Sequence, residues 1–299
     1  MRELSGKVAV VTGGASGIGR ATGALFAERG MRVVLSDIEQ QALDGAVEEL
    51  RGRGLDVRGV RTDVASFESC ERMRDETLRL FGPPHVVFLN AGVAPVTRGS
   101  LWELEMKDWQ WAFAVNVWGV IHGIKALVSA IVEQGEGGHV VITSSSVGVV
   151  APTASGVIYN TTKAAELSIA ESLYGQLKEL GPEYSASVLV PPGTINTGLF
   201  TSARNRQPEY APPEPGKQRP PLSYEKMLEM MNKSGNYRRP VQPEEVAEYV
   251  LEGVENDVFW LLPGPRHADM QENFDRIIRA RADSMLSRGD PLVYLQKST

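Results

Sequence analysis

Near its beginning the chain has a short apolar run, a glycine-rich turn and an amphipathic helical pattern in direct succession. The run covers residues 8–11, the turn contains Gly13, Gly17 and Gly19, and the helical pattern stops at Gly30. This order is typical of a phosphate-binding turn, because glycines let the backbone approach a pyrophosphate and the helix N-terminus offers free N–H groups. The spacing differs from G-x-G-x-x-G, so the turn alone is weak evidence.

The rest of the chain repeats the alternation of apolar runs and helical patterns. Further strand-like runs lie at residues 32–36, 57–62, 86–89, 139–143, 186–190 and 258–262. Seven strands that alternate with helices predict an α/β fold: a single doubly wound Rossmann domain with a mostly parallel seven-stranded sheet and helices on both faces. Ligands of such sheets bind at the carboxyl ends of the strands.

The whole chain, residues 1–299, is expected to form this one domain. We divide it into a cofactor and catalytic core at 1–197, a substrate loop or lid at 198–240, and a last helix–strand unit with a C-terminal extension at 241–299.

Acidic residues follow the second and third strands. Asp37 comes directly after the second strand and stands eighteen residues after Gly19. A carboxylate there accepts hydrogen bonds from the ribose hydroxyls of an adenosine and repels a 2′-phosphate. No arginine directly follows Asp37 or lies within the glycine turn, so NAD is favoured over NADP. The pair Asp63-Val64, after the third strand, would face an adenine ring.

Tyr159 and Lys163 are four residues apart in a helical pattern, which puts both side chains on one face. A phenol has a reference pKa of about 10, and a nearby cation lowers it towards the range useful for acid-base catalysis. Ser146 stands thirteen residues before Tyr159, just after a strand. These three side chains predict a proton-transfer site for an alcohol or a carbonyl. Taken alone, the Tyr–Lys spacing is common on ordinary amphipathic helices.

Composition excludes several classes of protein. The net charge of −6 and the pI near 5.4 provide no basic surface for nucleic acid. Cys70 is the only cysteine, which excludes an internal disulfide and fits a reducing cytosol. The four histidines have no ligand-like spacing, so no metal site is expected. The apolar runs of the sequence are each expected to be too short for a signal peptide or a membrane span, so we expect a cytoplasmic protein.

Taken together, the motifs resemble those of the short-chain dehydrogenase/reductase family. They occur in that family's order and approximate spacing over residues 7–197: the glycine turn at 12–19, Asn90-Ala91-Gly92, Asn116, Ser146, Tyr159-x3-Lys163, and Pro192-Gly193 followed by Thr197. Each motif is modest alone, but six in register are highly specific.

The resemblance implies roles for single residues. Tyr159 would be the acid-base catalyst, Ser146 would hydrogen-bond the substrate oxygen, Lys163 would bind the nicotinamide ribose, and Asn116 would distort its helix around a water of a proton relay. Ser146 is chosen over Ser144 and Ser145 by its thirteen-residue distance from Tyr159. The implied cofactor contacts are Gly13, Ser16, Gly17, Ile18, Gly19, Asp37, Ile38, Asp63, Val64, Asn90, Ala91, Gly92, Tyr159, Lys163, Pro192, Gly193, Ile195 and Thr197.

These expectations describe an NAD-dependent oxidoreductase that interconverts a secondary alcohol and a ketone. Apolar residues near the motifs suggest a bulky aromatic, terpenoid or steroid substrate, although each of them could equally belong to the core. The alternative is a non-catalytic NAD-sensing or scaffold protein on the same fold. An epimerase or dehydratase of the extended fold should have a G-x-x-G-x-x-G turn, which is absent here. The resemblance also implies a homo-oligomer, either a dimer or a tetramer.

The last third of the chain departs from these patterns. Residues 208–221 are rich in proline and fit either a surface insertion or a lid over the substrate. A methionine-rich helix is expected at 222–234, and another helix at about 269–287, beyond the usual end of the family. That tail could cover the active site, cap a dimer or lie on the surface.

Overall fold

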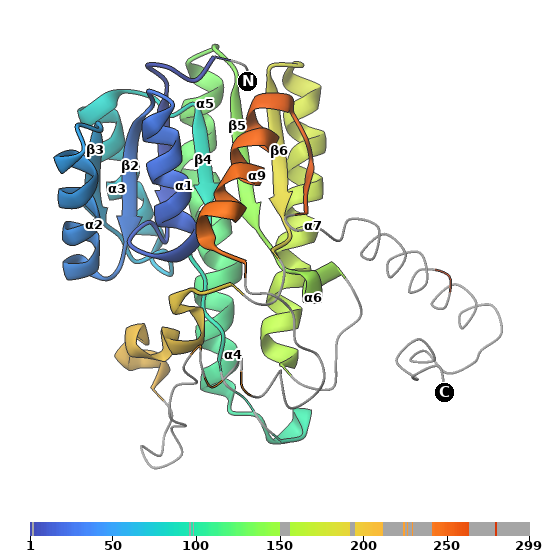
Figure 1. Ribbon diagram of the computed structural model, residues 1–299. Helices are drawn as coiled ribbons and strands as arrows, with labels where there is room; N and C mark the ends of the chain where they lie inside the picture. Colours follow the sequence, from blue (N-terminus) through green and yellow to red (C-terminus); the bar gives the residue numbers. More distant parts are fainter. Residues whose placement is uncertain are drawn as a thin grey trace.

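The centre of the molecule is a parallel sheet of seven strands (Figure 1). The computed structural model describes residues 1, 3–95, 97, 99–149, 156–191, 195–211, 224, 226, 229, 241–262 and 279. Pro192, Gly193, most of the proline-rich segment and the two helices expected at 222–234 and 269–287 therefore lie outside the described residues, apart from isolated positions.

The strand order is β3-β2-β1-β4-β5-β6-β7, and every neighbouring pair is parallel. The direction in which successive strands are added reverses between β1 and β4, which is the switch point of a doubly wound sheet. The predicted fold class is thus confirmed. The strands are β1 (Val8–Thr12), β2 (Arg32–Asp37), β3 (Val57–Arg61), β4 (Val86–Leu89), β5 (Gly138–Thr143), β6 (Tyr184–Leu189) and β7 (Trp260–Leu261).

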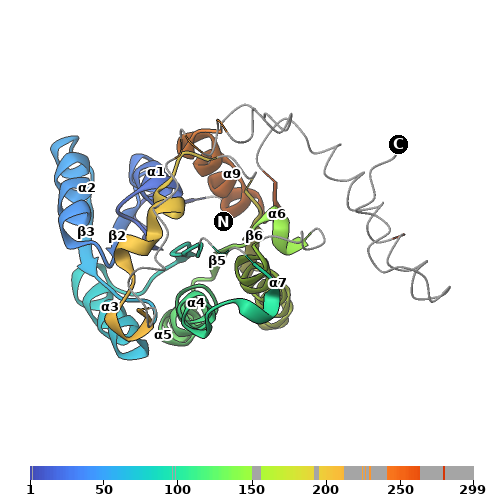
Figure 2. The ribbon, with the colours of Figure 1, turned by 90° about the horizontal axis from the view of Figure 1, so that it is seen from below.

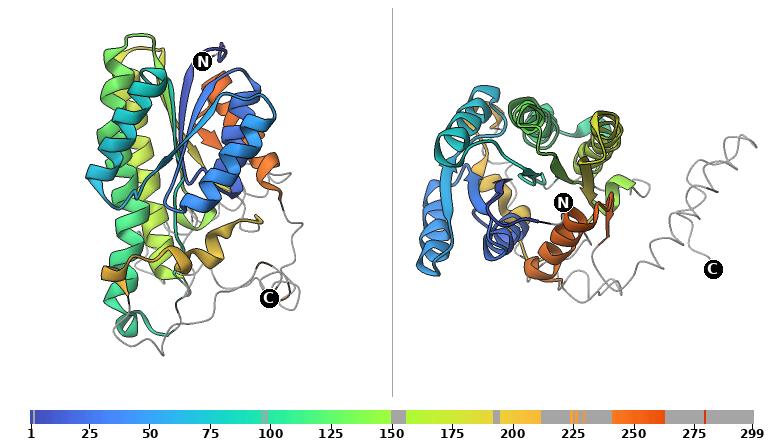
Figure 3. Two further views of the ribbon diagram at one scale, coloured as in Figure 1. Left: turned by 90° about the vertical axis from the view of Figure 1, so that its left-hand side faces the viewer. Right: turned by 90° about the horizontal axis from the view of Figure 1, so that it is seen from above.

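Helices cover both faces of the sheet (Figure 3). One layer contains α1 (Gly17–Glu28), α2 (Gln40–Gly52) and α9 (Pro243–Asn256). The other contains α3 (Phe67–Phe81), α4 (Met106–Ala112), α5 (Gly119–Glu133) and α7 (Val157–Leu180). The central strands are buried along their whole length, because helices enclose both of their faces. Their continuous apolar runs follow from that double burial.

A distorted helix runs through the second layer. Residues Phe113–Trp118 form a π-helical segment between α4 and α5, so the helix expected from residue 108 begins at Met106 and is interrupted in the middle. Within the described part of the chain, Met106–Glu133 is the one helix long and apolar enough to cross a membrane, contrary to our estimate from the sequence. Half of its apolar window is buried inside the protein, where it packs against α3 and α7. Its apolar composition is therefore explained by the core.

The carboxyl ends of the strands form one edge of the molecule, seen from below in Figure 2. Among the described residues, four short helices lie at this edge: η1 (Leu101–Glu103), α6 (Ser146–Val149), η3 (Gly198–Asn205) and η4 (Pro208–Tyr210). In Figure 2 the segment with η3 and η4 crosses beneath β2 towards α3. An isolated parallel bridge between Ile195 and Val241 ties the start of this segment to the residues before α9.

Candidate active site

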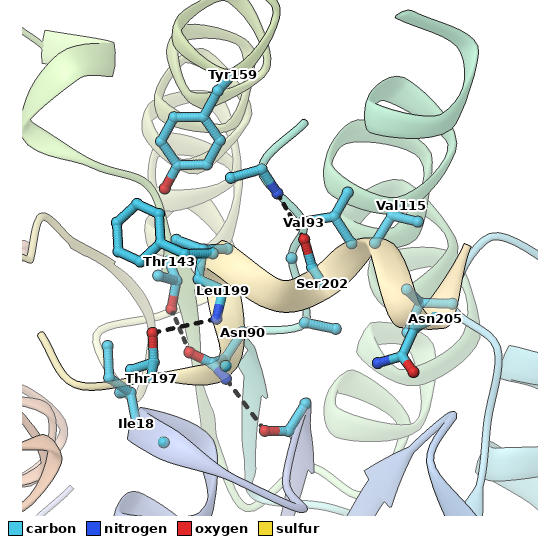
Figure 4. Close-up of a pocket in the computed structure, with 18 of the residues that line it drawn as sticks. Ile18, Asn90, Val93, Val115, Thr143, Tyr159, Thr197, Leu199, Ser202 and Asn205 are labelled. Carbon is cyan, nitrogen blue, oxygen red and sulfur yellow. Dashed lines mark hydrogen bonds between the residues drawn. The ribbon is translucent and has the colours of Figure 1, made fainter. Parts of the chain in front are cut away.

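A cavity of about 580 Å³ opens at the carboxyl edge of the sheet, around the switch point between β1 and β4 (Figure 4). Almost all residues predicted to contact the cofactor lie along it. Those that line the cavity are Gly13, Ser16, Gly17, Ile18, Asp37, Ile38, Asp63, Val64, Asn90, Ala91, Gly92, Tyr159, Lys163, Ile195 and Thr197, together with Ser146. Gly19 and Asn116 lie behind the walls, and Pro192 and Gly193 fall outside the described residues.

The glycine turn is shaped so that a ligand can approach its backbone. Gly13 and Gly17 have φ of +64° and +53°, which few residues other than glycine adopt. A Cβ on Gly19 would lie 2.2 Å from the carbonyl oxygen of Gly13, and one on Gly17 would lie 2.9 Å from Cγ2 of Thr197. The turn therefore packs tightly and leaves the N-terminus of α1 facing the cavity, a geometry that fits a pyrophosphate.

Asp37 stands at the tip of β2, beside this turn. Its carboxylate accepts hydrogen bonds from the backbone N–H groups of Ala15 (3.0 Å) and Glu39 (3.1 Å). Burial raises the pKa of Asp37, although these N–H groups oppose the rise. The carboxylate is held in a fixed position at the end of the cavity where an adenosine ribose would lie.

Asn90 connects the ends of the strands on either side of the switch point. Its amide donates to the carbonyl of Thr12 at 3.2 Å, and its side-chain oxygen accepts from the hydroxyl of Thr143 at 3.2 Å. The hydroxyl of Thr12 accepts from the backbone N–H groups of Asn90 and Ala91 at 2.9 and 3.1 Å. This network, partly visible in Figure 4, fixes the floor of the cavity between β1, β4 and β5.

Tyr159 and Lys163 lie in the first turns of α7, on the face that looks into the cavity. The ammonium Nζ of Lys163 is 5.5 Å from the centre of the Tyr159 ring, which confirms that the two side chains meet. Burial raises the pKa of the Tyr159 phenol, while the charge of Lys163 lowers it. The effect of burial is the larger of the two.

Glu166 is a buried partner of Lys163 that the sequence reasoning missed. Its carboxylate lies 2.8 Å from Nζ of Lys163, which also donates to the carbonyl of Thr143 at 2.9 Å. Burial raises the pKa of Glu166 to about 7, against the opposing effect of Lys163. Burial would lower the pKa of Lys163, but Glu166 and Tyr159 raise it, so the lysine is held as a cation. The three-residue spacing on one helix was the available signal.

Ser145, the last residue before α6, lowers the pKa of the Tyr159 phenol, against the larger effect of burial, whereas the spacing had selected Ser146. Ser145 is buried and Ser146 is half-buried, and both line the cavity. The neighbouring Ser144 turns away and donates to the carbonyl of Lys163 at 2.6 Å. Ser145 is therefore a second candidate beside Ser146 for the hydrogen bond to the substrate oxygen, and the role assigned to Ser146 stays a prediction.

Asn116 lies inside the π-helical segment, as expected for a residue that distorts its helix. It is fully buried. Its amide donates to the carbonyl of Val93 at 3.0 Å and to the hydroxyl of Thr162 at 2.9 Å, and its oxygen accepts from the backbone N–H of Val93 at 2.8 Å. Asn116 thus ties the loop after β4 to α7. Its part in a proton relay stays a prediction.

The part of the cavity around Tyr159 is mostly apolar. The walls there come from the loop after β4, from α4 with the π-helical segment, and from η3; they include Val93, Pro95, Trp111, Val115, Leu199 and Phe200. The hydroxyl of Ser202 accepts from the backbone N–H of Ala94 at 3.2 Å and joins η3 to the loop after β4 (Figure 4). Among the residues that the structure describes, no group of three or more His, Cys, Asp or Glu side chains is arranged to hold a metal ion.

Comparisons with known proteins agree with this geometry. The model of the family described as short chain dehydrogenase matches residues 7–208. The 1-deoxy-11-beta-hydroxypentalenate dehydrogenase of Streptomyces avermitilis is 38% identical over 199 residues, 66% of this chain and 72% of that protein. The C alpha-dehydrogenase of Sphingobium sp. strain SYK-6 is 28% identical over 95% of this chain and 88% of its own length.

Among solved structures, a short chain dehydrogenase/reductase from Burkholderia phymatum in complex with NAD has a TM-score of 0.82 and 33% sequence identity. The match covers 97% of this chain and 98% of that chain, and so includes the sheet and both helix layers.

Proposed function

Because this chain belongs to the short-chain dehydrogenase/reductase family, we propose that it is an NAD-dependent oxidoreductase that interconverts a secondary alcohol and a ketone. The observation that carries this proposal is the position of Tyr159 and Lys163 in the same cavity as the glycine turn and Asp37. Hydride exchange with an alcohol requires a pair of side chains for proton transfer and a site that binds the dinucleotide.

In the proposed mechanism Tyr159 takes the proton of the substrate hydroxyl during oxidation and returns it during reduction. Ser145 hydrogen-bonds the substrate oxygen from the opposite side, with Ser146 as the adjacent candidate. Lys163 stabilises the phenolate by its charge, while Glu166 and the carbonyl of Thr143 keep its ammonium in place. When bound, NAD supplies the carbon that accepts the hydride.

NAD rather than NADP is proposed because Asp37 is fixed at the tip of β2 by two backbone N–H groups. A carboxylate there can accept hydrogen bonds from ribose hydroxyls and repels a phosphate on the 2′ position. The NAD bound to the relative from Burkholderia phymatum supports the same choice.

The apolar walls near Tyr159 support a bulky hydrophobic alcohol as substrate, of the aromatic, terpenoid or steroid class. Val93, Trp111, Val115 and Leu199 provide a surface on which such a molecule could be buried. The name of the Streptomyces avermitilis relative, a hydroxypentalenate dehydrogenase, describes the oxidation of a hydroxylated compound and fits this proposal.

The test is to follow absorbance of reduced nicotinamide with NAD and with NADP, against a panel of aromatic, alicyclic and steroid secondary alcohols. Tyr159→Phe should reduce turnover by about 10²- to 10⁴-fold, the usual contribution of general acid-base catalysis. Tyr174→Phe is a matched control, because Tyr174 lies on the same helix, outside the cavity, against Phe259.

Turnover that survives Tyr159→Phe would contradict the mechanism. Tight NADH binding without turnover of any alcohol or ketone would instead favour a non-catalytic NAD sensor.

We also propose a homo-oligomer, a dimer or tetramer, in the cytoplasm. The exposed indole of Trp118, at the end of the π-helical segment before α5, supports a contact between copies on this helix layer.

A further inference from the structure

The segment of residues 198–210, here called the strap, forms the outer wall of the adenosine end of the cavity. It contains η3 and η4 and crosses the carboxyl end of β2 towards α3 (Figure 2). Gln207 donates from its amide to both carboxylate oxygens of Asp63, at 3.0 and 2.9 Å. Arg204 and Asn205 bind Glu39, which follows β2 by two residues. The strap is therefore fastened to acidic residues at two neighbouring strand tips.

The pair of Arg204 and Glu39 is a two-point contact. Nε of Arg204 is 3.0 Å from Oε2 of Glu39, and its Nη2 is 2.5 Å from Oε1. The remaining nitrogen, Nη1, donates to the carbonyl of Gly198 at 3.1 Å and to the hydroxyl of Thr201 at 2.7 Å. The guanidinium lowers the pKa of Glu39, which keeps the carboxylate ionised at neutral pH. Every nitrogen of the arginine is thus engaged within the protein.

This engagement matters because of the charges around the cavity. Among the described residues that line it, Lys163 and Arg204 are the only cations, and both are paired with a carboxylate. Arg204 is the cation at the adenosine end, where Asp37, Glu39 and Asp63 also face the cavity. At the adenosine end, the positive charge of Arg204 is therefore neutralised by Glu39, which follows β2.

We propose that Glu39 is a specificity-determining residue that acts through Arg204. By binding the guanidinium, Glu39 keeps from a 2′-phosphate the one cation that the described residues place at the adenosine end of the cavity. Asp37 repels the phosphate directly, whereas Glu39 removes its nearest source of attraction. The inference rests on the proposed binding of a nicotinamide dinucleotide in this cavity. It does not depend on the identity of the alcohol.

The physical basis is the affinity of arginine for phosphate. A guanidinium binds phosphate in a two-point, charge-assisted geometry, the same one that it uses here with a carboxylate. A neutral amide at position 39 still fits the space but no longer competes for the positive charge. The backbone of Arg204 remains part of η3, and its flexible side chain can then turn the guanidinium towards the ribose.

The experiment measures dissociation constants of NADPH and NADH by nucleotide fluorescence, without any alcohol substrate. In Glu39→Gln, NADPH affinity should rise about tenfold while NADH affinity changes less than about twofold. Adding Arg204→Gln to Glu39→Gln should abolish the gain. Glu49→Gln is the matched control, because it also breaks an exposed Arg–Glu pair, with Arg20, but lies outside the cavity.

Each outcome decides between distinct explanations. An equal gain in Glu39→Gln with and without Arg204 would overturn the proposal, since Glu39 would then act by its own charge alone. No gain in NADPH affinity, in a variant that binds NADH normally, would also overturn it. If the unaltered protein binds neither nucleotide, the proposed function itself fails. Circular dichroism at increasing temperature verifies that each variant is folded.

Discussion

Three adjacent serines line the cavity beside Tyr159, and one of them lowers the pKa of its phenol. That residue is Ser145, which ends the loop after β5, while Ser146 begins α6. Ser145→Ala should lower turnover by about 10²- to 10³-fold, as the loss of a hydrogen bond to the reacting oxygen does elsewhere. Ser146→Ala should lower it by less than about threefold. Single-turnover rates of the two variants, with NADH affinity as the control, would separate them; the reverse order would restore Ser146 to the role that its spacing suggested.

Single residues also show where reasoning from the sequence reaches its limit. Tyr159 and Lys163 could be identified because a helix places residues four apart on one face. The choice among the adjacent serines could not be made by counting, since a count along the chain does not show how the end of β5 turns into α6. Glu166 was missed although it obeys the same helical spacing, because nothing in the sequence shows that position 166 is buried against the lysine.

At the scale of elements, the strands and the core helices were predictable because each has its own local pattern. β1 and β5 read as continuous apolar runs, and α7 contains the helical pattern expected around Tyr159 and Lys163. The strap was not predictable in the same way. Its Arg204 pairs with a residue 165 positions earlier, a contact that depends on the closed sheet and not on any local pattern.

The glycine turn before α1 gives a prediction at this scale. A Cβ at Gly19 would lie 2.2 Å from the carbonyl oxygen of Gly13, whereas one at Gly45, on the exposed face of α2, would meet nothing within 4 Å. Gly19→Ala should therefore destabilise the protein by about 1–3 kcal/mol and abolish NADH binding, because the turn must open. Gly45→Ala should stabilise it by up to about 1 kcal/mol and leave binding intact. Urea denaturation measures the change in stability, and nucleotide fluorescence measures NADH binding. Normal NADH binding by Gly19→Ala would contradict the assignment of the glycine turn as the pyrophosphate site.

At the scale of the whole molecule, the two helix layers enclose the sheet so fully that polar groups on central strands are removed from water. His139 on β5 is an example, with 2% of its surface exposed. Its Nε2 lies 2.6 Å from the hydroxyl of Ser187 on the neighbouring β6. A buried imidazole without a carboxylate partner resists protonation, so the closed sheet connects the stability of the entire fold to pH.

Burial lowers the pKa of His139 to about 3, with smaller effects from the N-terminal amino group, Asp257 and Lys178. In the unfolded chain an imidazole takes up a proton near pH 6.5, whereas the folded protein keeps His139 neutral. The unfolded state therefore binds more protons below pH 6.5, and the free energy of unfolding falls as the pH falls, down to the folded pKa near 3. Between pH 6.5 and 5 this single group should cost about 2 kcal/mol. Urea denaturation at both pH values should show that loss in the unaltered protein and a correspondingly smaller loss in His139→Gln. His122→Gln is the control, because His122, on α5, is only half-buried. Equal pH dependence in all three proteins would mean that other groups govern the loss of stability in acid.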